Sequence, residues 1–123
     1  TLVIHADYSY AAGSMAIDAL MALPKPPTAV FCANDTMALG ALWRCKQLGL
    51  SVPGSISIAG IDDIYSASIS DPPLTTVRQP RQEIGAAGVD MLISMLEGRR
   101  GVAREIVLPH EVVVRSSTGA PHS

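Results

Sequence analysis

The sequence predicts an α/β fold in which a parallel sheet is flanked by helices. Short apolar runs alternate with helix-patterned segments in the first half of the chain, in the order β-α-β-α-β. Strands buried on both faces are apolar throughout, and helical crossovers between them give a parallel sheet. With 123 residues, 48% of them hydrophobic and 16% charged, the chain has the size and composition of one globular domain.

Three apolar runs are the strands expected in the first half, at residues 2–4, 28–33 and 57–61. Between them, apolar residues recur at helical spacing, at Gly13, Ala16, Ile17 and Leu20 and again at Ala38, Ala41, Leu42, Cys45 and Leu48. Asp35 is the expected N-cap of the second helix. Gly49 follows the end of that helix, where glycine commonly terminates one.

The second half has a less regular pattern. Residues 74–78 are rich in β-branched side chains and predict a strand. A long helix is expected to open at Gln79-Pro80 and to end at Gly98, with one apolar face formed by Ile84, Ala87, Gly88, Met91, Leu92, Met95 and Leu96. Two further strands are expected at about 105–108 and 111–115, followed by a frayed tail from Ser116.

The apolar face of the long helix needs a partner, because such a face is not stable in water. We expect an oligomer, with a segment-swapped form as one option, or a helix that folds back on the remaining sheet. The chain opens on Thr1 within a predicted strand and has no initiator methionine, which indicates a fragment.

Composition excludes several classes of function. A net charge of -2 argues against a broad nucleic-acid-binding face. The sequence contains neither an apolar run near the roughly 20 residues of a membrane span nor a signal-peptide pattern. Cys32 and Cys45 lie inside apolar segments, so we expect buried, inert thiols and a reducing, cytoplasmic setting.

No motif for catalysis, cofactor binding or metal binding stands out. The sequence has no P-loop, dinucleotide fingerprint or Gly-x-Ser-x-Gly elbow, and the histidines at 5, 110 and 122 share no metal-ligand spacing. Four aspartates at strand ends are compatible with a Mg²⁺ site of a phosphoryl-transfer domain, namely Asp7, Asp35, Asp62 and Asp63. They lack the Lys, Ser or Thr partners that such chemistry uses. We therefore expect no enzyme, and a small hydrolase or phosphotransfer domain remains the minor alternative.

Polar side chains follow each of the first three predicted strands, and they predict a ligand site. Tyr8, Asn34 and Asp62 would meet at the carboxyl edge of the parallel sheet, where open α/β sheets bind ligands. Asp62 can accept hydrogen bonds from hydroxyl or ring N–H groups, Asn34 can donate and accept, and Tyr8 can stack on a sugar or a base. The structural alternatives are that Asn34 and the Asp62-Asp63 pair simply form turns, and that Tyr8 is a half-exposed loop aromatic.

An exposed apolar pair predicts a protein–protein interface. Leu39 and Trp43 are four residues apart on the second helix, opposite its core stripe, and Gly40 beside them leaves room for close approach. Exposed apolar patches centred on tryptophan are typical of partner surfaces. The alternative is that another element of the same chain covers Trp43.

Several motifs in register resemble the LacI/GalR family of transcriptional repressors. They are PTAVFCANDTMALGAL, the GLSVP turn, ISIAGIDD, PPLTTVRQP and the closing LPHEVVVRSST. Periplasmic sugar-binding proteins share the fold and a similar Ala-Asn-Asp motif. The run VP…ISIAGIDD…PPLTTVRQP favours the repressors.

The resemblance implies part of a two-lobed, periplasmic-binding-protein-like effector domain. Residues 1–74 would belong to the second lobe, 75–100 would cross to the first lobe, and 101–123 would return. Family ligand positions carry over onto Asn34, Asp62 and Gln79, and Tyr8 lies where the family often has an aromatic residue. The dimer surface would include Leu39, Trp43, Ala67 and Ile69.

The function implied is that of the effector-sensing and dimerising part of a DNA-binding regulator. A small polar metabolite, with a sugar expected and a purine-like compound as a variant, would alter the affinity for operator DNA. Contact with the operator would come only from a DNA-binding head outside this chain. The alternative is a periplasmic sugar-binding protein of a transport system.

Overall fold

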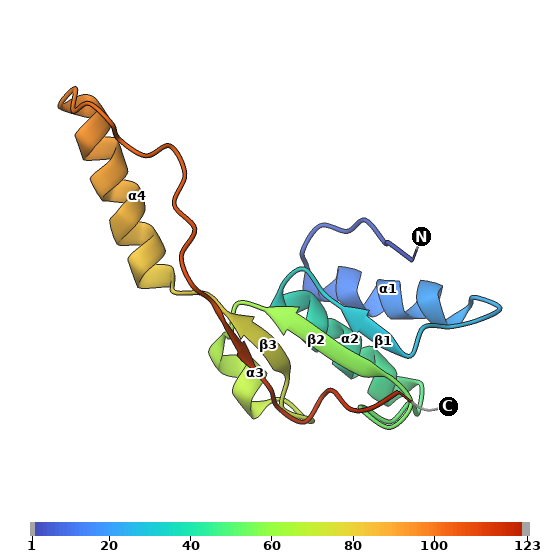
Figure 1. Ribbon diagram of the computed structural model, residues 1–123. Coiled ribbons are helices and arrows are strands. Elements are labelled where there is room, and N and C mark those ends of the chain that lie inside the picture. The colour runs from blue at the N-terminus through green and yellow to red at the C-terminus, as the bar shows by residue number, and fades with distance from the viewer. Residues whose placement is uncertain (1, 122–123) are drawn as a thin grey trace. The chain divides into compact units, whose positions relative to one another are not determined.

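The computed structural model describes residues 2–121 and has the α/β architecture that the sequence predicts (Figure 1). Its four helices are α1 (Tyr10–Met21), α2 (Asp35–Gln47), α3 (Tyr65–Ile69) and α4 (Arg81–Leu96). Its sheet has the order β1-β2-β3-β4, formed by Ala29–Phe31, Ser57–Ile61, Thr75–Arg78 and Glu111–Val113. The pairs β1–β2 and β2–β3 are parallel, with Ala29 opposite Ser57 and Ala59 opposite Thr75.

The chain divides into two compact units. Thr1–Arg78 and Val112–Ser123 form the first, which we call the sheet unit, and Gln79–Glu111 forms the second, the α4 unit. The expected lobe boundaries after residues 74 and 100 refer to a larger domain and stay a prediction.

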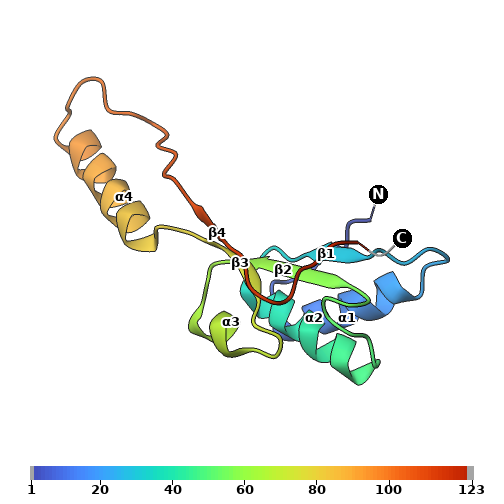
Figure 2. The same ribbon diagram turned by 60° about the horizontal axis from the view of Figure 1, so that its bottom comes forward.

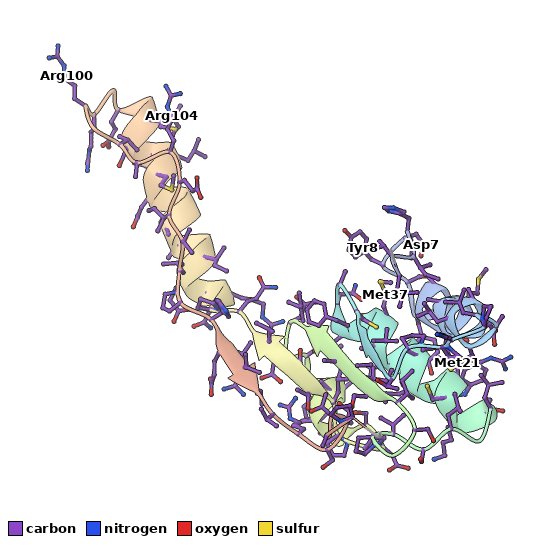
Figure 3. The ribbon with its side chains drawn as sticks, turned by 45° about the vertical axis from the view of Figure 1, so that its right-hand side comes forward. Asp7, Tyr8, Met21, Met37, Arg100 and Arg104 are labelled. Carbon is purple, nitrogen blue, oxygen red and sulfur yellow. The ribbon has the colours of Figure 1, made fainter. Side chains whose placement is uncertain are left out.

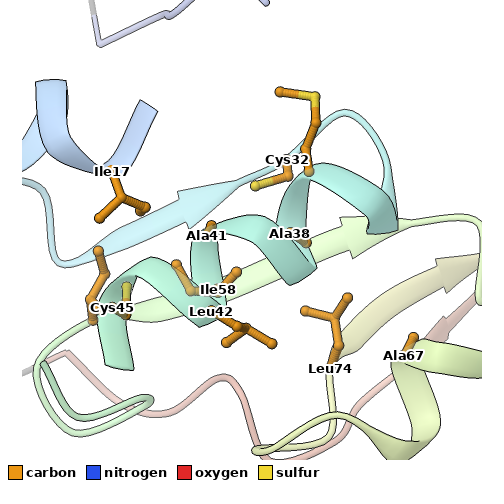
Figure 4. Close-up of a cluster of buried hydrophobic side chains, with 11 residues drawn as sticks. Ile17, Cys32, Ala38, Ala41, Leu42, Cys45, Ile58, Ala67 and Leu74 are labelled. Atoms are coloured by element: carbon orange, nitrogen blue, oxygen red, sulfur yellow. The ribbon is translucent and has the colours of Figure 1, made fainter. Parts of the chain in front are cut away.

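The core of the sheet unit lies between α1, α2 and one face of the sheet (Figures 2 and 4). Burial alternates along β2, with Ile58 and Gly60 buried on the side facing α2. Ile17 of α1 and Cys45 of α2 are fully buried in the same cluster. Each large aliphatic side chain buried in this way contributes roughly 1.5–3 kcal/mol.

Two glycines allow α1 and α2 to touch backbone to backbone. A Cβ atom at Gly13 would lie 2.0 Å from the carbonyl oxygen of Met37, and one at Gly40 would lie 2.0 Å from that of Tyr10. The space beside Gly40 is therefore filled by α1. The expectation that Gly40 leaves room for an external partner is wrong, because its neighbour is the chain's own first helix.

The helix ends follow local hydrogen bonding. Asn34, rather than Asp35, is the N-cap of α2, since its side-chain oxygen accepts from the Met37 amide at 2.8 Å. Asp35 is the first helical residue and is fully buried. Gly49 lies at φ 70°, and the Leu50 amide donates to the Cys45 carbonyl at 2.9 Å, as expected for a glycine after a helix.

Three expected strands differ from the structure. Residues 2–4 form no strand, and Leu2 and Val3 are 62% and 61% exposed. Residues 2–4 do not pair with the edge strand β1, and a segment without backbone hydrogen bonds to a neighbouring strand is not part of a sheet. At this edge β1 is shorter than the expected 28–33, and Phe31 is exposed. Residues 105–108 likewise contain no strand.

Residues 116–119 are held by hydrogen bonds, so the expectation that the chain frays from Ser116 is wrong for this segment, and residues 122–123 lie outside the described part. Ser117 is fully buried, and its hydroxyl accepts from the Thr75 amide at 2.8 Å and donates to the Ile58 carbonyl at 2.6 Å. The Ile58 amide donates back to the Ser117 carbonyl at 2.9 Å. This segment therefore joins β2 to β3.

Helix α4 has no buried residue. Its apolar side chains include Leu92 and Leu96, which are 57% and 78% exposed. The α4 unit by itself therefore does not bury the predicted apolar face, and burial in an oligomer or against the sheet stays a prediction. None of the helices in the described part of the chain is both long and apolar enough to cross a membrane.

Replacing Gly13 with Ala should lower the free energy of unfolding of the sheet unit by about 1–3 kcal/mol, because the new methyl group overlaps the Met37 backbone. Urea unfolding followed by fluorescence of Trp43, the single tryptophan, measures this. Gly85→Ala is the matched control, since no atom lies within 4 Å of a Cβ at that helical glycine. Equal midpoints for both variants would contradict the close helix contact.

Replacing Ser117 with Ala should lower the free energy of unfolding of the sheet unit by about 1–3 kcal/mol. The substitution removes a hydroxyl that is both a buried donor and a buried acceptor for main-chain groups. Ser68→Ala is the control, since the Ser68 hydroxyl is exposed and donates only to the nearby Tyr65 carbonyl. A Ser117→Ala chain as stable as the Ser68→Ala chain would show that the tail does not hold the sheet.

Candidate functional site

A constrained turn follows β2 and carries the predicted ligand residue Asp62. Asp62 has φ 122° and its neighbour Asp63 has φ 53°. Positive φ values in residues other than glycine cost on the order of 1–3 kcal/mol each and concentrate at functional sites. The Asp62 amide donates to the Val77 carbonyl at 2.9 Å, which ties the turn to β3.

The carboxylate of Asp35 stabilises the same turn through two hydrogen bonds. It accepts from the Thr76 hydroxyl at 2.5 Å and from the Ile64 amide at 3.0 Å. Burial raises the pKa of Asp35 above its usual value, and the negative charges of Asp62 and Asp63 raise it further, against the lowering effect of the two hydrogen bonds. Because Asp35 is fully buried, it positions the turn and does not face a ligand.

Asp63 also stabilises the turn, because its carboxylate forms ion pairs with two arginines. Its carboxylate oxygens lie 2.6 Å from Nε of Arg78 and 2.6 Å from Nη2 of Arg115. Burial by itself would raise the pKa of Asp63, but the hydrogen bonds and charges of Arg115 and Arg78 outweigh it and hold the pKa below its usual value. The sequence pattern predicted Asp63 as a turn residue or as one carboxylate of a Mg²⁺ site, and it did not reveal the two arginines, which are 15 and 52 positions away.

Asn34 and Tyr8 are brought together by a hydrogen bond. The Asn34 side-chain nitrogen donates to the Tyr8 carbonyl at 3.1 Å while its oxygen caps α2. Tyr8 has φ 65° and a side chain that is 63% exposed, and Figure 3 shows it beside Asp7 on the segment before α1. An amide oxygen accepts two hydrogen bonds and an amide nitrogen donates two, so Asn34 keeps one of each for a ligand.

Gln79 follows β3 directly and is the first residue of the α4 unit. It is half-buried, and its backbone carbonyl accepts from the Arg81 amide at 2.9 Å. The sheet unit therefore holds Tyr8, Asn34 and Asp62, and the α4 unit holds the fourth predicted ligand residue.

The predicted interface residues lie on one side of the sheet unit, with one exception. Leu39, Trp43 and Ile69 line an open hollow of about 350 Å³. Trp43 is 47% exposed, and its ring centroid lies 6.4 Å from that of Tyr10. Tyr10 of α1 thus contacts Trp43 without covering it. Ala67 is fully buried in the core, so its side chain is not available on this surface.

Other reactive groups are held in inert environments. Cys32 and Cys45 are free and buried, as expected, and burial raises the pKa of each thiol to about 11. Such thiols are protonated and poorly nucleophilic at neutral pH. Within residues 2–121, no three His, Cys, Asp or Glu side chains gather so that they could hold a metal ion.

Known proteins with similar sequences are transcriptional regulators. The chain is 43% identical over 118 residues to the HTH-type transcriptional repressor CytR of Escherichia coli K12, which covers 96% of the chain and 35% of CytR. It is also 43% identical over 119 residues to the HTH-type transcriptional regulator MalR of Streptomyces coelicolor, covering 97% of the chain and 34% of MalR. The chain therefore spans about a third of the length of these relatives.

Several solved structures that resemble this chain are also of transcriptional regulators. A putative transcriptional regulator LacI from Bacillus cereus subsp. cytotoxis aligns with a TM-score of 0.90 and 30% identity, over 96% of this chain and 42% of that one. The lac repressor dimer bound to operator and the anti-inducer ONPF aligns with a TM-score of 0.84 and 35% identity, over 93% and 40%. A complex of the transcriptional regulator CelR with cellobiose aligns with a TM-score of 0.82 and 32% identity, over 90% and 34%.

The family model described as a periplasmic binding protein-like domain matches residues 2–118, almost the whole chain. This match and the relatives confirm the resemblance drawn from the sequence motifs, and none of the relatives named here is a transport protein or an enzyme. The chain therefore belongs to the periplasmic-binding-protein-like domain family and is homologous to the LacI-type transcriptional regulators.

Proposed function

We propose that this chain is the effector-sensing and dimerising part of a cytoplasmic LacI-type regulator. The observation that carries the proposal is the turn at Asp62, in which two residues other than glycine have positive φ. Hydrogen bonds to the Asp35 carboxylate stabilise this turn. A strained backbone conformation persists only where surrounding contacts fix it. Such conformations are concentrated at ligand-binding and other functional sites. The kinship with LacI-type regulators supports the same assignment.

The effector would be a polar small molecule, with a sugar as the first expectation and a purine-like compound as the second. Asp62 would accept hydrogen bonds from hydroxyl or ring N–H groups, and Asn34 would add its remaining donor and acceptor. Tyr8 offers an exposed ring for stacking on a sugar or base face. Gln79 would contribute from the α4 unit, and cellobiose bound to the related CelR supports a carbohydrate.

The mechanism would couple effector binding to operator binding. An effector bound between lobes would change their orientation and with it the spacing of two DNA-binding heads in a dimer. Effector and operator then alter each other's affinity by the same factor. Operator contacts would come from a head outside this chain, in keeping with its net charge of -2. A periplasmic transport protein is the alternative, and the regulator relatives do not favour it.

In the longer regulator that contains this chain, Asp62→Ala should abolish the rise in melting temperature caused by its effector, because the main hydrogen-bond acceptor is lost. The measurement is a thermal-shift series with cellobiose, maltose, glucose, adenosine and hypoxanthine. Asp71→Ala is the matched control, since Asp71 forms only an exposed ion pair with Lys46. A compound that stabilises the Asp62→Ala and Asp71→Ala variants equally would refute the assignment of Asp62.

The dimer surface has its own test. Trp43→Ala should weaken self-association of the regulator at least tenfold, as expected for a tryptophan at the centre of an interface. Sedimentation equilibrium measures the dissociation constant. Met15→Ala removes an exposed apolar side chain from α1, outside the Trp43 hollow, and should leave the constant unchanged. If Trp43→Ala dimerises as tightly as Met15→Ala, the dimer surface lies elsewhere.

A further inference from the structure

The ion-pair triad of Asp63, Arg78 and Arg115 lies where the chain passes between its two units. Arg78 is the last residue of the sheet unit before Gln79, and Arg115 lies three residues after the chain returns at Val112. β3 and β4 are neighbours in the sheet, so the outgoing and returning segments run next to each other (Figure 2). Asp63 accepts from one arginine of each segment, at 2.6 Å in both cases.

Arg115 is bound more tightly than an ordinary surface arginine. Its side chain is 17% exposed, and Nη1 donates to the Leu74 carbonyl at 2.8 Å while Nη2 donates to Asp63. Its backbone amide donates to the Thr75 hydroxyl at 2.9 Å. The returning segment is therefore fixed to the start of β3 and to the Asp62-Asp63 turn by the same residue. The Arg78 side chain, at 50% exposed, is the looser partner.

The contrast with the other ion pairs of the sheet unit supports a specific role. Lys46 and Asp71 are 68% and 86% exposed, and Arg44 and Asp18 are 30% and 48% exposed. Exposed pairs of this kind contribute little, because water screens them. The Asp63 carboxylate is 10% exposed and bridges two cations, and it adjoins Asp62, which carries the proposed effector contact.

We propose that Asp63 is a positioning residue that links the Asp62 turn to the two segments passing between the units. Movement of either segment would pull on Asp63 through its arginine and so reorient Asp62, and a ligand on Asp62 would bias the two segments in return. This inference rests on the proposed function for its biological meaning. The linkage itself is a property of the chain, and such linkage acts equally in both directions.

Hydrogen exchange of backbone amides in this chain tests the linkage in both directions without a ligand. Asp63→Asn, which keeps the size but removes the charge, should accelerate exchange at the hydrogen-bonded amides of Arg115 and Ser116 by roughly two- to thirtyfold, the range found for coupling through contact networks. Arg78→Gln, at a half-exposed side chain, should in turn accelerate exchange at the amides of Asp62 and Ile64. Amides in the core of α2 should be unaffected in both variants.

Asp71→Asn, in the exposed Lys46 pair, is the matched control and should leave all of these amides unchanged. An increase spread evenly over α2 and the two segments would mean that Asp63 is merely structural. No increase at Arg115 and Ser116 would mean that the returning segment is not linked to Asp63, and either result overturns the proposal. Arg78→Gln retains the Asp63–Arg115 pair, so it keeps the test available if Asp63→Asn does not fold.

Failure of this inference is separable from failure of the proposed function. The exchange measurement contains no ligand and judges the linkage alone. The thermal-shift series with Asp62→Ala judges the ligand site alone. Normal exchange in Asp63→Asn together with loss of stabilisation in Asp62→Ala would remove the linkage and keep the sensor assignment.

Discussion

The buried carboxylate of Asp35 is the contact on which the arrangement of this protein depends. It begins α2 and accepts hydrogen bonds from Thr76 in β3 and from Ile64 after β2, so one side chain joins three segments that are distant in sequence. A buried carboxylate is costly unless its oxygens are paired, and here both are. Gly60 makes this possible, because a Cβ there would lie within 2.4 Å of an Asp35 oxygen.

The same region carries the electrostatic organisation of the candidate site. Asp35, Asp62 and Asp63 are close enough for the charges of the latter two to raise the pKa of Asp35. Arg78 and Arg115 offset this concentration of negative charge by pairing with Asp63. The residues on either side of Asp62 in the sequence are thus held in place by their own contacts. Such preorganisation of the turn favours selective binding of a polar ligand.

The two proposed activities, ligand sensing and dimerisation, involve different parts of helix α2. Its first turn, with Asn34 and Asp35, lies at the proposed ligand edge, and its middle places Leu39 and Trp43 at the hollow. Because α2 packs backbone to backbone on α1 through Gly13 and Gly40, the two helices have little freedom to slide. A rigid α1–α2 pair suits a subunit interface whose geometry must stay constant while ligand-linked parts move.

Sequence by itself determined the features that depend on local patterns. The alternation of apolar runs and helical stripes predicted α1, α2, β2, β3 and α4 and the parallel sheet, because burial periodicity is written in neighbouring residues. Gly49 and the buried cysteines were predicted for the same reason. The motifs around Asn34 and Asp62 also identified the family that the comparisons establish.

Tertiary structure decided everything that depends on contacts between distant residues. Residues 2–4 form no strand although they are apolar, because they do not pair with the edge strand β1, and a local apolar pattern does not encode which segments lie side by side. Asn34 caps α2 in place of the expected Asp35, because the buried Asp35 carboxylate accepts a hydrogen bond from Thr76. Arg115 and Ser117 gained their roles from bonds to residues more than 40 positions away, and no local pattern encodes a partner at that distance.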